Sequence, residues 1–203
     1  MKKIIVALFC ILSLSSYCQN TQKVKDAKEV VWFGLDFTKV KFRGSDRYFR
    51  NPLKIREVFF EEWNMLFLKE KEKYDLAYSF DKSRFIDNIS QSIEKNKYTD
   101  VKRAIGIDEY SIPNDSIKSI IKDYTTNANA EVGLIFIVEC LDQIYGEVKI
   151  NVTFFDIKTK EILISKSLIG DAGGRGFKNY WAGGIYRVMR QSSKNYNSWL
   201  KGK

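Results

Sequence analysis

Residues 131–169 read EVGLIFIVECLDQIYGEVKINVTFFDIKTKEILISKSLI, and this stretch decides the fold. Its first part, up to Leu141, is apolar on both faces, as in a central strand. Residues 147–155 alternate between apolar and polar side chains, which is the period of a strand with one buried face. Residues 161–169 form a third strand. The short turns DQIYG and DIKTK between them predict antiparallel hairpins.

One more strand is predicted upstream, at residues 30–42, because VVWFGLDFTKVKF is rich in β-branched and aromatic residues. Capping residues and a helical period of apolar residues predict helices from Pro52 into the run KEKEKYD, and over 81–97, 111–124 and 177–200.

These elements predict a single α+β (mixed α/β) domain. We expect a mixed sheet that has three sequential antiparallel strands at about 131–169 plus an N-terminal strand. The polar face of the strand at 147–155 indicates helices packed mainly on one face of the sheet.

The N-terminus has the layout of a secretory signal peptide, residues 1–18. Two lysines precede an apolar run that is too short to span a bilayer, and small polar residues follow. We therefore expect export to the periplasm or outside the cell, a flexible leader at residues 19–29, and one domain over 30–203. Cys18 could instead carry a lipid, although the bulky Tyr17 before it argues against a lipoprotein.

The chain of 203 residues has a formal net charge of +9, and removal of Lys2 and Lys3 with the leader lowers it by two, to +7. Such an excess favours anionic partners, although a basic solubilising surface is the commoner explanation. The predicted export argues against nucleic acid. The basic, aromatic helix at 177–200 allows peripheral contact with a membrane surface, but core packing is the commoner use of such a stripe.

Catalytic residues are scarce. The sequence has no histidine, and Cys140 is the only cysteine beyond the leader, in a strand where we expect it to be buried. Histidine-based catalysis and thiolate metal sites are thereby excluded, so we predict no catalytic set, no metal and no cofactor. A carboxylate hydrolase would have to draw on acidic residues alone: Asp36, Glu61, Glu62, Glu139, Asp142 and Asp156.

Residues 170–184, GDAGGRGFKNYWAGG, hold a cluster of glycines before the last helix. The cluster lacks the Lys-Ser/Thr ending of a nucleotide-binding loop and the G-x-G-x-x-G spacing. We interpret it as a tight turn that lets the helix approach the last strand closely. The alternative is a site for a small anion at the start of the helix, formed by Gly173, Gly174, Arg175 and Lys178.

Three stretches carry a resemblance: WFGLDFT at 32–38, EEWNMLFLKEKEKYD at 61–75, and residues 152–182. Together they resemble an uncharacterised family of small secreted envelope proteins of Gram-negative bacteria. The segment DIKTKEIL, with its flanking strands and following helix, is similar to the periplasmic α/β domain of the curli-secretion lipoprotein and penicillin-binding-protein activator group. This similarity implies a mixed sheet with helices and a role in protein contact.

The leading hypothesis is therefore a non-catalytic secreted or periplasmic module that binds another envelope component, either protein or glycan. Tyr48, Phe49, Tyr180 and Tyr186 are candidate contact residues where they are exposed, although most aromatic residues of this kind belong to the core. The alternatives are a receptor for a small ligand or anion at the glycine-rich turn, and a carboxylate-dependent hydrolase. The sequence makes no prediction of the oligomeric state.

Overall fold

The computed structural model describes residues 19–202, and its seven-stranded sheet is organised around one long strand. This strand, β5 (Val132–Asp142), is buried along its whole length, as its apolar sequence predicts. Its two edges have different kinds of neighbour, parallel on one side and antiparallel on the other. The predicted signal peptide, residues 1–18, lies outside the described residues.

Parallel strands form one half of the sheet. They are β1 (Glu29–Asp36), β2 (Lys41–Arg43), β3 (Arg84–Asp87) and β4 (Ile105–Gly106). β1 lies beside the first part of β5 and β2 lies beside its end. β3 extends the sheet beyond β1, and β4 extends it beyond β2.

Antiparallel strands form the other half, in which β6 (Glu147–Asp156) pairs with β5 and β7 (Ile162–Asp171) pairs with β6. The general α/β class is therefore confirmed. The description of the sheet as three antiparallel strands plus one N-terminal strand is wrong in detail, because β1 to β4 all pair in parallel. Parallel partners need long connections, so no local turn in the sequence reveals their pairing.

The predicted strand at residues 30–42 is divided into β1 and β2 by two buried asparagines. Asn64 accepts a hydrogen bond from the backbone N–H of Leu35 at 2.7 Å and donates to its carbonyl at 3.1 Å. Asn96 accepts from the backbone N–H of Phe37 at 2.7 Å. These side chains satisfy backbone groups at the end of β1, beyond its last pair with β3, where the chain leaves the ladder before it returns at Lys41.

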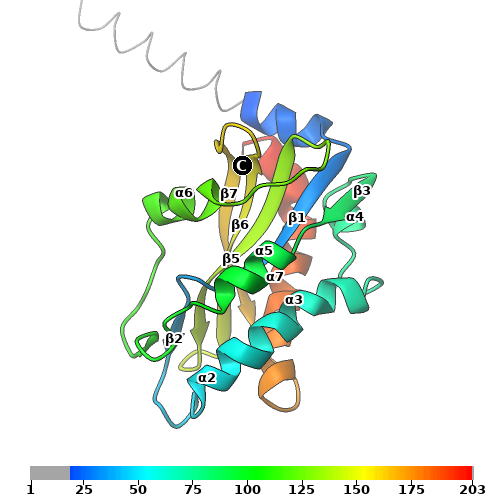
Figure 1. Ribbon diagram of the computed structural model, residues 1–203. Coiled ribbons are helices and arrows are strands. Elements are labelled where there is room, and N and C mark those ends of the chain that lie inside the picture. Colours follow the sequence, from blue (N-terminus) through cyan, green and yellow to red (C-terminus); the bar gives the residue numbers. More distant parts are fainter. Residues whose placement is uncertain (1–18, 203) are drawn as a thin grey trace, which may run out of the picture.

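Most helices cover one face of the sheet, the first face. A continuous helical segment comprises α2 (Pro52–Lys54), the π-helical turn η1 (Ile55–Phe59) and α3 (Phe60–Lys69), and it is followed by α4 (Leu76–Ser79) and α7 (Phe177–Leu200). Asn51 caps the segment as predicted, since its side chain accepts from the backbone N–H of Lys54 at 3.0 Å. Figure 1 shows α7, in orange to red, behind the strands.

The core on the first face is largely aromatic. Trp32 on β1, Trp63 on α3 and Trp181 on α7 are each fully buried there. The opposite or second face has a smaller core, beneath α6 (Asn114–Lys122), whose Ile117, Ile120 and Ile121 are buried as their spacing predicts. Helices thus pack mainly, but not solely, on one face.

The predicted helix at 81–97 is wrong in its first half. Residues 84–87 are the strand β3, and only α5 (Ser90–Asn96) is helical. Phe85 and Ile89 fit a helical spacing, but four residues of strand are too few to show a period of two. α5 supports β1, because Ser92 donates to the carbonyl of Phe33 at 2.5 Å and Asn96 donates to that of Leu35 at 2.9 Å.

Residues 19–26 form a helix where the sequence predicts a flexible leader. Val24 is fully buried, and Lys82 donates to the carbonyl oxygens of Val24 and Lys25 at 2.6 and 3.1 Å. Lys23 forms an ion pair with Asp156 at 2.6 Å. The helix is therefore held against the domain at both its buried and its charged side. No helix among residues 19–202 is long and apolar enough to cross a membrane.

Candidate functional site

The glycine-rich turn packs α7 against the sheet. A Cβ added to Gly183 would lie 2.0 Å from the carbonyl oxygen of Gly173, and one added to Gly170 would lie 2.2 Å from that of Gly184. Both contacts are with backbone, which has little room to move. These distances support our interpretation that the glycines permit a close approach of helix and strand.

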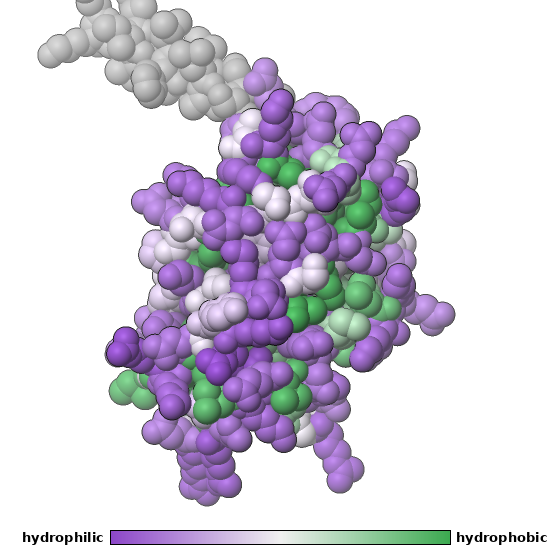
Figure 2. All heavy atoms as spheres, in the orientation of Figure 1, coloured by the Kyte–Doolittle hydropathy of each residue, from purple (hydrophilic) through white to green (hydrophobic). Residues whose placement is uncertain are grey.

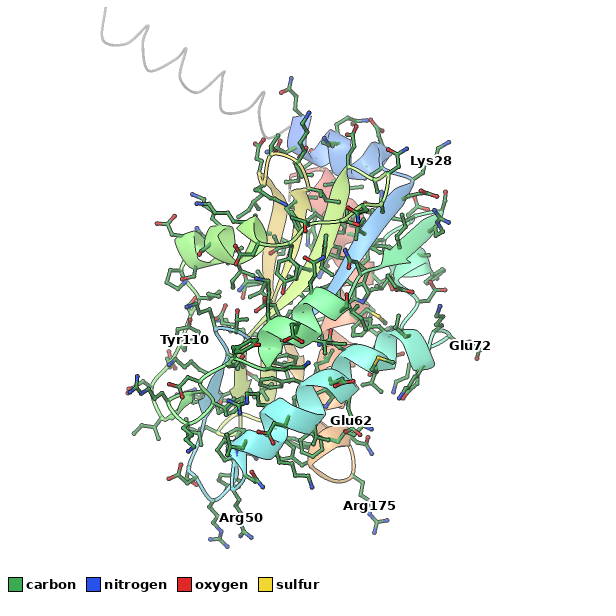
Figure 3. All side chains as sticks on the ribbon, in the orientation of Figure 1. Lys28, Arg50, Glu62, Glu72, Tyr110 and Arg175 are labelled. Carbon is green, nitrogen blue, oxygen red and sulfur yellow. The ribbon has the colours of Figure 1, made fainter. Side chains whose placement is uncertain are left out.

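The four residues of the suggested anion site point in different directions. Arg175 is exposed and extends away from the body at the lower end of the molecule (Figure 3). Lys178 pairs with Glu62 of α3 at 3.5 Å. Gly173 donates its backbone N–H to the carbonyl of Tyr180, and Gly174 has a φ of +138°. No structural observation tests anion binding itself, so this site stays a prediction.

The acidic residues considered for hydrolysis are dispersed and mostly engaged. Asp36 is buried and accepts a hydrogen bond from the Tyr124 hydroxyl at 2.6 Å. Burial and the Asp36 carboxylate raise the pKa of Tyr124, which keeps the phenol protonated as a donor. Two further acids pair with Lys23 and Lys178, respectively: Asp156 and Glu62.

Glu139 and Asp142 both lie near the end of β5, at the carboxyl ends of the parallel strands. Two hollows open there, of about 250 and about 220 Å³. Arg43, Glu109 and Tyr110 line both hollows and so divide them. We call the two hollows together the crevice; Tyr110 marks its place on the left of Figure 3.

The chain topology explains why a crevice forms at this place. β2 and β4 are parallel neighbours, but their following connections cover opposite faces of the sheet. The connection after β2 leads to α3 on the first face, and that after β4 leads to α6 on the second. A gap opens where neighbouring connections diverge, and ligands of open α/β sheets commonly bind in such gaps.

Arg43 is the central side chain of the crevice. It forms an ion pair with Asp142 at 2.8 Å, donates to the carbonyl of Ile107 at 3.0 Å, and lies 4.9 Å from the ring centroid of Tyr145. Asp142 in turn accepts from the backbone N–H groups of residues 144 and 145. One guanidinium therefore fixes the β5–β6 turn and the segment after β4 relative to each other.

A second ion pair lies at the base of the crevice. Glu139, 1% exposed, pairs with Lys149 at 2.7 Å and accepts from the amide of Asn151 at 2.6 Å. Cys140 is buried beside it, and burial raises the pKa of its thiol to about 12. The prediction that Cys140 belongs to the core is confirmed, and a thiol with this pKa is a poor nucleophile.

Large exposed apolar side chains lie in or next to the crevice: Tyr145 and Ile169 line it, and Ile107 and Ile144 adjoin lining residues in the chain. Ile107 is 70% exposed, Tyr145 63%, Ile144 53% and Ile169 44%. Figure 2 shows hydrophobic side chains at the lower left of the molecule, near the position of β2 in Figure 1. In a chain that buries most of its large apolar residues, several exposed ones around one hollow indicate a contact surface.

The charged groups that line the crevice balance. The cationic residues are Lys41, Arg43, Arg103 and Lys149, and the acidic residues are Asp108, Glu109, Asp142 and Glu147. The crevice is thus locally neutral within a basic protein. Such a surface does not favour a highly charged ligand.

A larger hollow, of about 550 Å³, lies at the opposite end of the sheet between residues 125–131 and the β6–β7 turn. Lys23 pairs there with both Glu131 and Asp156, and Lys158 and Lys160 also line the hollow. Although burial raises the pKa of Asp156, hydrogen bonds from Lys23 and Thr159 outweigh it and lower that pKa. These groups hold the N-terminal helix, so we favour the crevice as the candidate site.

The sequence reasoning did not find the crevice. Arg43 lies 67 residues before Tyr110, and Tyr145 and Lys149 follow a further 35 or more residues along the chain, so only the topology brings these side chains together. The one local signal is Arg43 itself, a charged residue at the end of an apolar strand. Among the described residues no group of three or more acidic or cysteine side chains is placed to hold a metal ion.

No protein-family model matches the chain, and no curated protein matches it. Among solved structures, the C-terminal domain of LpoB from Salmonella enterica matches over 71% of this chain and 84% of its own, at 14% identity and a TM-score of 0.32.

Proposed function

We propose that this protein is a non-catalytic module that binds another component of the cell envelope through the crevice and its apolar border. The observation that carries the proposal is the group of exposed isoleucines and Tyr145 around a polar, neutral hollow. Tyrosine and arginine side chains within an apolar surface are typical of protein contact sites. The envelope location rests on the predicted signal peptide.

The geometry of the acids supports a binding role over hydrolysis. A carboxylate that acts as nucleophile or base has to reach the substrate. Glu139 is buried beneath Lys149, and Asp142 is engaged by Arg43 and two backbone N–H groups. Both carboxylates therefore stabilise the surface from within, and neither is presented to a ligand.

Protein is the partner class that the crevice fits best. Its border is aliphatic as well as aromatic, and each hollow has the volume of one or two side chains. A partner could insert an apolar side chain beside Tyr145, whose other face is stacked on Arg43. If a glycan were found bound in the crevice, glycan would replace protein as the partner class.

Site-specific photocrosslinking in the producing cells tests the proposal. A photoreactive phenylalanine derivative replaces Tyr145, and the matched control carries it at Tyr78, which is 83% exposed on α4. We expect a discrete crosslinked protein from position 145 and none from position 78, and Ile107→Asp should abolish it. Equal crosslinking at both positions, or pelleting of the protein with peptidoglycan that Ile107→Asp abolishes, would overturn protein as the partner.

A further inference from the structure

β7 leaves one edge of the sheet open. Among the strands that the structure describes, β7 pairs only with β6. Gln191 of α7 donates to the carbonyl of Ile169 at 2.7 Å, so the backbone of this residue points away from β6. Because backbone groups alternate along a strand, Ser165 and Ser167 also direct their N–H and C=O groups outward.

No described helix lies across the middle of this edge. α7 contacts the edge near the end of β7, where Gln191 and Arg187 donate to the carbonyls of Ile169 and Asp171. Ser167 and Ile169 are exposed, and Ser165 is half-buried. An open edge of this kind is a template for the backbone of another extended segment.

The surface beside the open edge is strongly basic. Residues 162–200 contain six lysines and arginines but a single acidic residue, Asp171. Arg187, Arg190 and Lys194 are exposed on α7. Arg187 and Gln191 contact β7, and Lys194 follows on the same side of the helix. Arg190 lies one helical row further from the strand, where it donates to the Tyr186 hydroxyl at 3.4 Å.

We infer that the open edge of β7 binds an acidic, extended segment of another protein, which adds to the sheet as a further strand beside Ser165–Ile169. Backbone hydrogen bonds supply the pairing, and carboxylates of the segment lie against Arg187, Arg190 and Lys194. This goes beyond the proposed function, because it names a second surface with a partner of defined charge.

A second copy of this chain is a poor occupant of the same edge. Two β7 edges would bring together two groups of cations with one acid each, which is repulsive. Lys166 lies in the middle of β7, and a charged residue there opposes pairing with another edge of like charge. An acidic strand, in contrast, is attracted by the same cationic residues.

Three synthetic peptides test the inference, measured by fluorescence anisotropy. The first alternates glutamate and threonine. The second is the same sequence with some threonines replaced by proline, and the third alternates lysine and threonine. We expect only the first to bind. Its affinity should fall at about 1 M salt, where the screening length is only about 3 Å. Absence of binding by the first peptide overturns the inference.

Matched variants separate strand addition from charge attraction. Ser167→Pro removes an outward N–H without removing a bond to β6, and should weaken binding by about tenfold or more, whereas Ser167→Ala should leave it unchanged. Arg190→Glu with Lys194→Glu should weaken it similarly. If Ser167→Pro binds as well as the unaltered protein, the cations act without strand addition and the inference is wrong.

A second measurement applies to the unaltered protein. Hydrogen exchange at the amides of Ser165 and Ser167 should slow when the acidic peptide is present, because both become hydrogen-bonded. The amide of Lys166, which faces β6, should change little. Unaltered exchange at both serines in the presence of bound peptide would exclude the proposed pairing. Ile107→Asp in the crevice should leave all these results unchanged, so failure here is distinguishable from failure of the proposed function.

Discussion

Gly183 faces Gly173 so closely that a side-chain carbon on Gly183 would lie 2.0 Å from the Gly173 carbonyl oxygen. Ten residues separate the two, and between them the chain reverses from the end of β7 into α7. The position of the longest helix on the sheet therefore depends on the absence of one side chain.

We predict that Gly183→Ala destabilises the protein by about 3 kcal/mol, the upper part of the usual range for overpacking, because backbone obstructs the added carbon. The midpoint of thermal unfolding should fall by about 6–12 °C. Gly106→Ala is the control, since an added carbon there meets nothing within 4 Å. Equal midpoints for the two variants would show that α7 can shift to accommodate the methyl group.

Lys149→Met should destabilise the protein by about 3 kcal/mol, because it leaves the carboxylate of Glu139 buried without its ion pair. Lys149 is partly open to water, which keeps the effect at the lower end for broken buried pairs. Urea unfolding measures the loss. Lys158→Met is the control on an exposed lysine, and Glu139→Gln added to Lys149→Met should recover most of the stability. A double variant no more stable than Lys149→Met would contradict this account.

Cys140 should make the unfolding free energy depend on pH in the alkaline range. Burial raises the pKa of the folded thiol from 9.0 to about 12, so the unfolded chain loses this proton first as the pH rises. The contribution is complete below about pH 9 and is lost between about pH 9 and about pH 12. Relative to Cys140→Ala, the unaltered protein should therefore lose stability as the pH rises above about 9. A constant difference between the two proteins would show that the thiol is not shielded.

The helix at residues 19–26 should be protected from hydrogen exchange, because it is buried at Val24 and capped by Lys82. Lys82→Met should speed exchange in this helix by about tenfold, since it removes the donor to two terminal carbonyls. Lys25→Met is the control, because Lys25 contributes its carbonyl and not its ammonium group. Exchange as fast as in an unstructured peptide would restore the expectation of a flexible leader.

Elements with strong local signals could be predicted from the sequence. The 24-residue helix α7 has apolar residues on one face over its whole length, and the hairpins around β6 have short turns on both sides. α6 was predicted from the spacing of Ile117, Ile120 and Ile121. In each case the residues that determine the element lie within the element.

Elements that depend on distant partners could not be predicted. β3 is four residues long, and β4 is two, so each is a strand only because β1 or β2 lies beside it. The crevice has the same origin, since Arg43 meets Asp142 through the parallel pairing of β2 with β5. The charge of Arg43 is visible in the sequence, but its partner is 99 residues away.

The placement of β5 in the chain has a consequence for biosynthesis. β3 with β1, and β4 with β2, form two separate pairs that only β5 connects, yet β5 is encoded after all four. The sheet cannot close until residue 142 has been synthesised, so the first two thirds of the polypeptide remain without a native framework as they leave the ribosome. For a chain with the leader that this sequence predicts, late closure of the sheet keeps the polypeptide unfolded and therefore able to pass through a translocation channel.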